Sequence, residues 1–487
     1  MPPLIEHFQA ARGGLFALLA IALLVLPSFA LDQSNRSQEA DEQAFKSAAS
    51  DYESHQYDRA LTELSPLATR FPKSFEVNEL MGLILAARGD DAKAVRYFRL
   101  AANLDSKSSA AHTNLASCLF RLRESKLAES EFKKGVELES NNYGANHNLG
   151  EFYIQSGNIA AAIPYLEKAQ RINPLAYENG YDLSLAYLET QRFGDASKQL
   201  RELVRFQDTA ELHNLLGKAE EKEGHYLQAA QEYEKATQMD PSEANIFDWG
   251  LELLQHQTLD PAIQVFTAGA QRYPNSARME IGLGIAFFAR GYYDKAVGAF
   301  ARATDLAPKD PRPYLFLGKA YNISDSQAEG VSERLRRFME LEAGNGQARY
   351  YYAMSLWKGK RTEGLSPDLS QVERLLKDAL KLDPTFADAH LQLGNLYSEQ
   401  AKFPQAISEY HLAVKCDPDL AGAYYRLGQL YIRTGEKQLA QEQFKVYERL
   451  HDEQGADAER RRREIKKFIY SMTGGRDGNQ AESGSPH

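Results

Sequence analysis

The chain has 487 residues, and its 57 Lys and Arg against 67 Asp and Glu give a formal net charge of −10. This acidic excess argues against nucleic acid as the main partner, because nucleic-acid binding depends on basic surface. The two cysteines, Cys118 and Cys416, are too few and too widely separated to indicate a disulfide framework or a zinc site.

The N-terminus has the layout of a secretory signal peptide. Arg12 precedes an apolar run from Leu15 to Leu26, and a small-x-small triplet that ends at Ala30 follows it. The run falls short of the ~20 residues that cross a bilayer, so we predict a signal peptide over residues 1–30, with an uncleaved N-terminal anchor as the alternative. Residues 31–40 are predicted to be a linker. The protein is thus expected to be exported, periplasmic or secreted, and membrane-anchored if the signal is uncleaved.

The rest of the chain repeats with a period of 33 or 34 residues. The segment around Gly394 superimposes on the segment around Gly428 with a shift of 34. A Leu-Gly or equivalent pair recurs in the same register upstream, at Met81-Gly82, Leu115-Ala116, Leu149-Gly150, Leu183-Ser184, Leu216-Gly217, Trp249-Gly250, Leu283-Gly284 and Leu317-Gly318. A period of this length indicates a repeat architecture.

Each repeat carries two further marks. An Ala is followed four residues later by an aromatic residue or Leu, as in Ala94 and Phe98 or Ala296 and Phe300, and a proline such as Pro384 closes many units. Together these residues resemble the tetratricopeptide repeat family, in its exported bacterial form. The resemblance implies an all-α fold, a right-handed superhelical α-solenoid of about twelve helix-turn-helix units over residues 41–452.

Close helix packing explains the pattern. Gly or Ala at the eighth position of a unit and Ala at the twentieth let two helices approach, while Tyr and Phe fill the space between pairs. The tenth unit, near Met354, is degenerate, and the Gly and Pro residues of the stretch from Lys358 to Leu369 predict an exposed loop there. We predict a basic C-terminal capping helix over residues 453–473 and a disordered tail over residues 474–487.

No sequence motif for catalysis is found. The chain has no His-Glu-x-x-His, no phosphate-binding loop ending in Gly-Lys-Ser/Thr and no Gly-x-Ser-x-Gly. Nearly every residue of the repeat region is committed to helices, so no segment is left for a catalytic domain. We expect a protein that is not an enzyme and that uses no cofactor and no metal.

The resemblance implies that the first helices of the units line a concave groove, where partners would bind. The inward positions two, five, six and nine form a polar stretch and then an apolar one. The polar stretch is Thr113, Asn114, His147, Asn148, Glu151, Tyr181 and Asp182, and the apolar stretch is Phe247, Leu251, Ile281, Ile285, Leu315 and Phe316. The polar stretch is predicted to hydrogen-bond an extended peptide and the apolar stretch to grip side chains or a helix. The alternative is that these apolar residues pack against adjacent repeats and that the amides serve intramolecular hydrogen bonds.

One known function of the family is disfavoured. Family members that bind the carboxylate tails of chaperones carry Lys, Asn and Arg at set groove positions. Asn148 fills the middle position, but Thr113 and Ser117 precede it and Glu178 and Asp182 follow, so negative charges stand where the family has positive ones.

The sequence therefore predicts a non-catalytic scaffold of the cell envelope or secreted space that binds peptide or helical segments of other proteins. A polysaccharide-binding accessory subunit of an export or assembly system, using residues such as Tyr181 and Asp182, is the alternative. Membrane contact through the N-terminal anchor or the basic C-terminal helix stays open, as does the oligomeric state.

Overall fold

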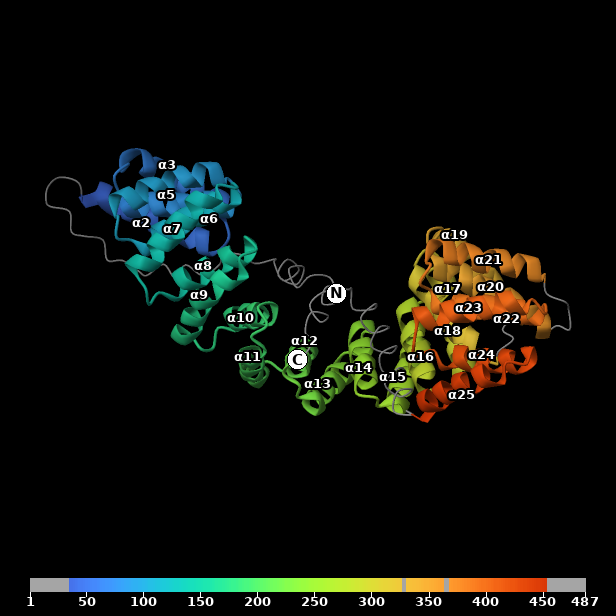
Figure 1. Ribbon diagram of the computed structural model, residues 1–487. Helices are drawn as coiled ribbons and strands as arrows, with labels where there is room; N and C mark the ends of the chain where they lie inside the picture. Colours follow the sequence, from blue (N-terminus) through green and yellow to red (C-terminus); the bar gives the residue numbers. More distant parts are fainter. Residues whose placement is uncertain (1–34, 326–329, 363–367, 453–487) are drawn as a thin grey trace. The chain divides into compact units, whose positions relative to one another are not determined.

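The computed structural model describes residues 35–325, 330–362 and 368–452, and these residues form 24 α-helices and no β-strand (Figure 1). In chain order the helices are α2 (Asn35–Glu53), α3 (Tyr57–Arg70), α4 (Phe75–Ala87), α5 (Asp91–Leu104), α6 (Ser109–Arg121), α7 (Ser125–Leu138), α8 (Tyr143–Gln155), α9 (Ile159–Ile172), α10 (Tyr177–Glu189), α11 (Phe193–Phe206), α12 (Ala210–Glu223), α13 (Tyr226–Met239), α14 (Glu243–Gln255), α15 (Leu259–Arg272), α16 (Ala277–Arg290), α17 (Tyr293–Leu306), α18 (Pro311–Ile323), α19 (Val331–Leu341), α20 (Gly346–Thr362), α21 (Leu369–Leu382), α22 (Ala387–Glu399), α23 (Phe403–Cys416), α24 (Ala421–Thr434) and α25 (Lys437–Asp452).

The helices follow one another as twelve pairs, from α2 and α3 to α24 and α25, which is the number of repeats predicted. The chain divides into two compact units, an N-terminal unit up to His225 and a C-terminal unit from Tyr226 onward. Within each unit a helix packs on its pair partner and on the helix that follows, as expected for an α-solenoid. The even-numbered helices, called first helices below, also contact one another in series, for example α4 with α6 and α22 with α24.

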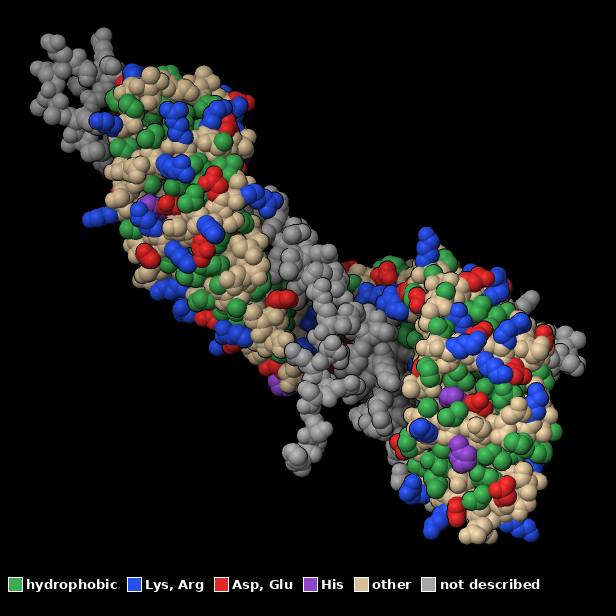
Figure 2. Space-filling view, turned by 45° about the horizontal axis from the view of Figure 1, so that its top comes forward, with side chains coloured by type: hydrophobic (Ala, Val, Ile, Leu, Met, Phe, Trp, Pro, Cys, Tyr) green, Lys and Arg blue, Asp and Glu red, His purple; other side chains and the backbone are tan. Residues whose placement is uncertain are grey.

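Each unit has its own large hydrophobic core. Phe98 and Phe132 are buried in the N-terminal unit, and Phe266 and Phe300 are buried in the C-terminal unit. Basic and acidic side chains are interspersed over the visible outer face of the helices (Figure 2). Most of the aromatic residues of the repeat pattern are therefore core, as the packing argument predicted.

The small residues of the pattern are explained by helix contacts. A Cβ added to Gly250 would lie 2.6 Å from Cζ of Phe266, and one added to Gly394 would lie 2.6 Å from Cδ1 of Tyr410. The alanine at the twentieth position is fully buried where it occurs, as at Ala262. Only residues with little or no side chain let the aromatic ring of the second helix lie flat against the first.

Two predicted boundaries need correction. Helix α2 begins at Asn35, inside the predicted linker 31–40. Helix α20 runs to Thr362, so the loop predicted from Lys358 is wrong over its first five residues, which are helical. Lys358 is not exposed, because its Nζ donates to the backbone oxygen of Tyr321 at 2.7 Å and also to that of Ser324, at the end of α18.

Several predictions fall outside the described residues. These are the signal peptide or anchor over residues 1–30, the basic capping helix over 453–473 and the tail over 474–487. Within the described ranges, no helix combines the length and the apolar character that crossing a bilayer requires.

Candidate partner-binding surfaces

The apolar half of the predicted groove is core. Five of its predicted side chains lie in the hydrophobic core of the C-terminal unit with 8% exposure or less: Phe247, Leu251, Ile281, Ile285 and Phe316. Leu315 is partly buried and packs against the same core. The small residues of α14 and α16, such as Gly250 and Gly282, bring neighbouring helices so close that these positions face another helix. The prediction that this stretch grips a partner is therefore wrong, and the packing alternative holds.

The polar half of the predicted groove lies at the surface. Six side chains on three successive first helices are half-buried: Asn114 on α6, His147, Asn148 and Glu151 on α8, and Tyr181 and Asp182 on α10. Thr113, next to Asn114, is buried and donates to the backbone oxygen of Ser109 at 2.9 Å. The structure thus brings the six polar residues onto adjacent helices of one unit, and their contact with a partner stays a prediction.

Three of these side chains already bind other residues of neighbouring repeats. Asn114 Nδ2 donates to Glu79 Oε1 at 2.5 Å, and His147 Nδ1 lies 3.1 Å from Asn179 Oδ1. The Tyr181 hydroxyl donates to Glu211 Oε1. The amide of Asn114 therefore has the intramolecular role that was the alternative to peptide binding.

The surface around α8 and α10 is electronegative. Burial, together with the nearby charges of Glu178, Asp182 and Glu151, raises the pKa of Tyr143 to about 12. Burial also raises the pKa of Tyr181, helped by the hydrogen bond to Glu211. Both phenols stay protonated at neutral pH, so the negative charge belongs to the carboxylates.

Glu79, on α4, is a residue that the sequence analysis missed. Burial raises the pKa of its carboxyl to about 7, against the opposing effect of the hydrogen bond from Asn114. Its second oxygen, Oε2, is buried and has no hydrogen-bond partner among the described residues. Glu79 occupies the fifth position of its repeat, as Thr113 and His147 do, so extending the register by one repeat would have found it.

A carboxylate and imidazole cluster lies at the end of α12. Glu220, Glu223 and His225 could each offer one atom to a metal ion. The atoms that would bind a metal already have partners. Glu220 pairs with Arg201 and with His225, and Glu223 Oε2 accepts a hydrogen bond from Ser197 Oγ at 2.7 Å. This network joins α11 to α12, and we assign no metal to it.

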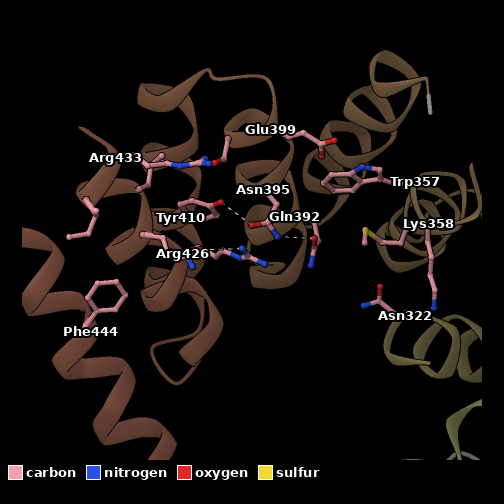
Figure 3. Close-up of a pocket in the computed structure, with 15 residues that line it drawn as sticks. Asn322, Trp357, Lys358, Gln392, Asn395, Glu399, Tyr410, Arg426, Arg433 and Phe444 are labelled. Carbon is pink, nitrogen blue, oxygen red and sulfur yellow. Dashed lines mark hydrogen bonds between the residues drawn. The ribbon is translucent and has the colours of Figure 1, made fainter. Parts of the chain in front are cut away.

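The C-terminal unit contains a cavity of about 1020 Å³ that the sequence analysis did not predict (Figure 3). Its walls come from the first helices α18, α20, α22 and α24, with contributions from α23 and α25. The lining residues are Asn322, Met354, Trp357, Lys358, Gln392, Asn395, Ser398, Glu399, Tyr410, Arg426, Gln429, Leu430, Ile432, Arg433 and Phe444.

Hydrogen bonds fix the side-chain amides along one wall of this cavity. Tyr410, from α23, donates its hydroxyl to Asn395 Oδ1 at 2.9 Å, and Asn395 Nδ2 donates to Gln392 Oε1 at 3.0 Å (Figure 3). Arg426 Nη1 donates to Gln429 Oε1 at 3.3 Å. The residues at 392, 395, 426 and 429 are the sixth and ninth positions of the last two repeats. These are the same register positions that gave the polar stretch of the earlier repeats, so the repeat pattern could have predicted them.

The electrostatics of the cavity differ from those of the polar surface on α8 and α10. Burial raises the pKa of Tyr410 to about 12, although the charges of Arg426 and Arg433 act in the opposite direction. Burial lowers the pKa of Lys358. Three cationic side chains and one acidic side chain, Glu399, line the cavity.

Comparisons with known proteins show the family. Models described as tetratricopeptide or TPR repeats match residues 45–111, 153–219, 210–243, 247–311, 375–408 and 394–435, together more than half of the chain. The chain belongs to the tetratricopeptide repeat family, which confirms the family drawn from the repeats, while the exported bacterial form stays a prediction. Proteins of this family typically mediate protein–protein interactions, and its scaffolds are generally non-catalytic.

Three curated relatives are distant. The chain is 22% identical over 339 residues to "BBSome complex member BBS4" of Bos taurus, covering 68% of this chain and 62% of that protein. It is 25% identical over 239 residues to the "Peroxisomal targeting signal receptor" of Candida albicans, covering 48% and 35%. It is 23% identical over 204 residues to "Protein O-mannosyl-transferase TMTC1" of Homo sapiens, covering 41% and 23%. The chain thus spans less than two thirds of each relative's length.

A solved structure of Naa15/Naa10 bound to HypK-THB is also similar. It shares 17% identity with this chain, covers 83% of it and 68% of its own chain, and gives a TM-score of 0.40.

Proposed function

We propose that this protein is a non-catalytic scaffold whose C-terminal unit holds a peptide or helical segment of a partner protein in its cavity. The observation that supports this most is the cavity itself, which is large enough for several residues of a partner. Side-chain amides at equivalent repeat positions line it and are ordered by hydrogen bonds. Amide groups both donate and accept hydrogen bonds, so they match the backbone of an extended segment. The apolar residues of the same cavity, such as Trp357 and Phe444, offer surface to side chains.

We also propose that the protein works outside the cytoplasm. The support is the sequence of residues 1–30, with Arg12, the apolar run from Leu15 to Leu26 and the small residues that end at Ala30. Sequencing the N-terminus of the protein from its native host tests this: a chain that begins at Leu31 supports export with cleavage, and a chain that begins at Met1 with cytosolic partners contradicts it.

Site-specific crosslinking tests the scaffold role. A photo-crosslinking residue in place of Gln429, which lines the cavity, is expected to capture one or a few partner proteins in the native host. The matched control replaces Leu412, which is 38% exposed on α23 and does not line the cavity. Equal capture from both positions, or capture of glycan with no protein, would contradict the proposal, and the second outcome would favour a polysaccharide-binding subunit.

A further inference from the structure

The inward positions of the N-terminal unit carry charge of one sign. Positions two, five, six and nine of the second to sixth repeats belong to the first helices α4, α6, α8, α10 and α12. Among the described residues, Glu178 and Glu211 at these positions form no ion pair with a Lys or Arg. The side chains at these positions, called the acidic face below, include one cation, Lys218, and six carboxyl groups: Glu76, Glu79, Glu151, Glu178, Asp182 and Glu211.

Aromatic rings accompany these carboxyl groups. Tyr143 and His147 stack on α8 with their ring centroids 5.5 Å apart. Tyr177 and Tyr181 occupy the same two repeat positions on α10 and stack with their centroids 6.2 Å apart. The members of each pair are four residues apart and therefore lie on one side of their helix. All four rings are half-buried, so part of each is at the surface.

The rings and the carboxylates lie close together in space. Tyr143 has three carboxylates near it, whose charges help to raise its pKa: those of Glu151, Glu178 and Asp182. The first belongs to the same helix as Tyr143 and the other two belong to α10. Two neighbouring repeats thus contribute negative charge around one ring.

A cationic side chain suits both kinds of group. Lys and Arg form charge-assisted hydrogen bonds with carboxylates, and both are attracted to the faces of tyrosine rings. An acidic segment would be repelled by the same surface. Packed helices lie about 8–10 Å apart, and residues three apart in an extended chain lie about 10 Å apart. A segment with several spaced cations can therefore meet one first helix after another.

A single metal ion fits the acidic face less well. Within the described ranges, the acidic groups near enough to one another to share an ion are Glu220 and Glu223, together with His225. These residues do not belong to the acidic face. The carboxyl groups of the face are distributed over four first helices, which favours a ligand whose charges are also distributed.

Glu79, on α4, gives independent evidence for a cationic donor. Its Oε1 accepts from Asn114 Nδ2 at 2.5 Å, whereas its Oε2 is buried and has no hydrogen-bond partner among the described residues. A buried carboxyl oxygen without a donor costs free energy, because it has lost its hydrogen bonds to water. An ammonium or guanidinium group beside Asn114 would supply that donor.

We propose that the acidic face of the N-terminal unit binds a segment of a partner protein that carries several Lys or Arg side chains. These side chains pair with carboxylates such as Glu178 and Glu211 and pack on the rings of Tyr143 and Tyr177. The inference is separate from the cavity of the C-terminal unit, and the two sites are expected to take segments of different composition.

Fluorescence anisotropy with the full chain and labelled peptides tests the proposal. The first peptide has Lys at every third position, with Gly and Ser between, and is blocked at both ends. The second has acetyl-lysine at the same positions, which keeps the length of the side chain and removes its charge. The acetyl-lysine peptide is expected to bind at least about tenfold more weakly than the Lys peptide.

Charge variants locate the binding. Glu178 and Glu211 are both exposed, so Glu178→Gln with Glu211→Gln should leave the fold intact, and it is expected to weaken binding of the Lys peptide about fivefold. The matched control is Glu137→Gln with Glu202→Gln, which changes the net charge equally at exposed positions of α7 and α11. The control is expected to leave the affinity unchanged.

A pair of variants at Tyr143 tests the contribution of the ring. Tyr143→Leu removes the ring and is expected to weaken binding of the Lys peptide about twofold to fivefold. Tyr143→Phe keeps the ring and is expected to bind as the parent protein does. Equal affinity of the two variants would show that the ring does not contact the cation.

Two other results would overturn the proposal as a whole. The first is equal affinity for the Lys and acetyl-lysine peptides, which would show that the cations are not recognised. The second is the same loss of affinity in the control variant as in the variant of Glu178 and Glu211, which would show that only the net charge of the protein matters.

Discussion

The two units use equivalent positions of the same repeat for different chemistry. In the N-terminal unit, polar groups on the first helices bind one another, as Asn114 binds Glu79 and Tyr181 binds Glu211, and carboxylates surround the tyrosines. In the C-terminal unit, positions six and nine of the last repeats line a cavity, and within the part of the chain that the structure describes neither Arg426 nor Arg433 forms an ion pair. The helix framework therefore fixes the position of each side chain. The type of residue at that position determines whether the side chain binds within the chain or can bind a partner.

The largest expected effect concerns the two separate cores. Phe132 and Phe300 are almost completely buried, one in each unit. Phe132→Ala is expected to lower the free energy of unfolding of the N-terminal unit by about 3–5 kcal/mol, and Phe300→Ala that of the C-terminal unit, because each leaves a cavity in one core. Hydrogen exchange measured by mass spectrometry over residues 35–225 and over residues 226–452 reports the stability of each unit separately.

Leu412→Ala, at a half-exposed position of α23, is the control for the core variants and is expected to change little. Equal loss of protection in both units from either Phe variant would show that the two cores unfold as one cooperative body, which contradicts this comparison.

The next effect concerns the buried carboxyl of the N-terminal unit. Burial raises the pKa of Glu79 from 4.5 to about 7, so the folded state holds this proton more tightly than the unfolded chain does. The resulting stability is complete below pH 4.5 and is lost as the pH rises through 7. Glu79→Gln, which imitates the protonated form, is expected to raise the free energy of unfolding at pH 8 by up to about 3 kcal/mol and to change it little at pH 4.5.

Urea unfolding of the parent protein and of Glu79→Gln across this pH range measures the difference. Glu137→Gln, at an exposed position of α7, is the matched control and is expected to show no such pH dependence. A constant difference between Glu79→Gln and the parent protein at all pH values would show that folding does not shift the pKa of Glu79.

The smallest effect concerns the polar surface of the N-terminal unit. Alanine at both Asn114 and Asn148 is expected to weaken capture of a partner segment on this unit by a few-fold, since each amide contributes about 0.5–1.5 kcal/mol of hydrogen bonding. Pull-down from the native host measures the captured partner, with the exposed Asn141→Ala as control. Unchanged capture would mean that these amides serve only the internal contacts of the repeats.

Some features of the candidate sites could be predicted and others could not. The residues Asn114, His147, Asn148, Glu151, Tyr181 and Asp182 were assigned to the surface of first helices, and the structure places them there. The apolar set around Phe247 and Ile285 had the same register positions but lies in the core. The register gives the direction of a side chain relative to its own helix. It does not give the distance to the next helix, which depends on the small residues of both.

The sequence by itself determined the family, the helical class and the number of repeats. Small residues recur every 33 or 34 positions, and an aromatic residue follows in most repeats. This period is typical of repeated pairs of closely packed helices. The tertiary structure alone decided that the register positions of α14 and α16 are core, that Glu79 is a buried acid, and that residues from six helices enclose one cavity. These properties depend on how neighbouring repeats pack, because burial, pKa and cavity volume arise from groups that are distant in sequence and close in space.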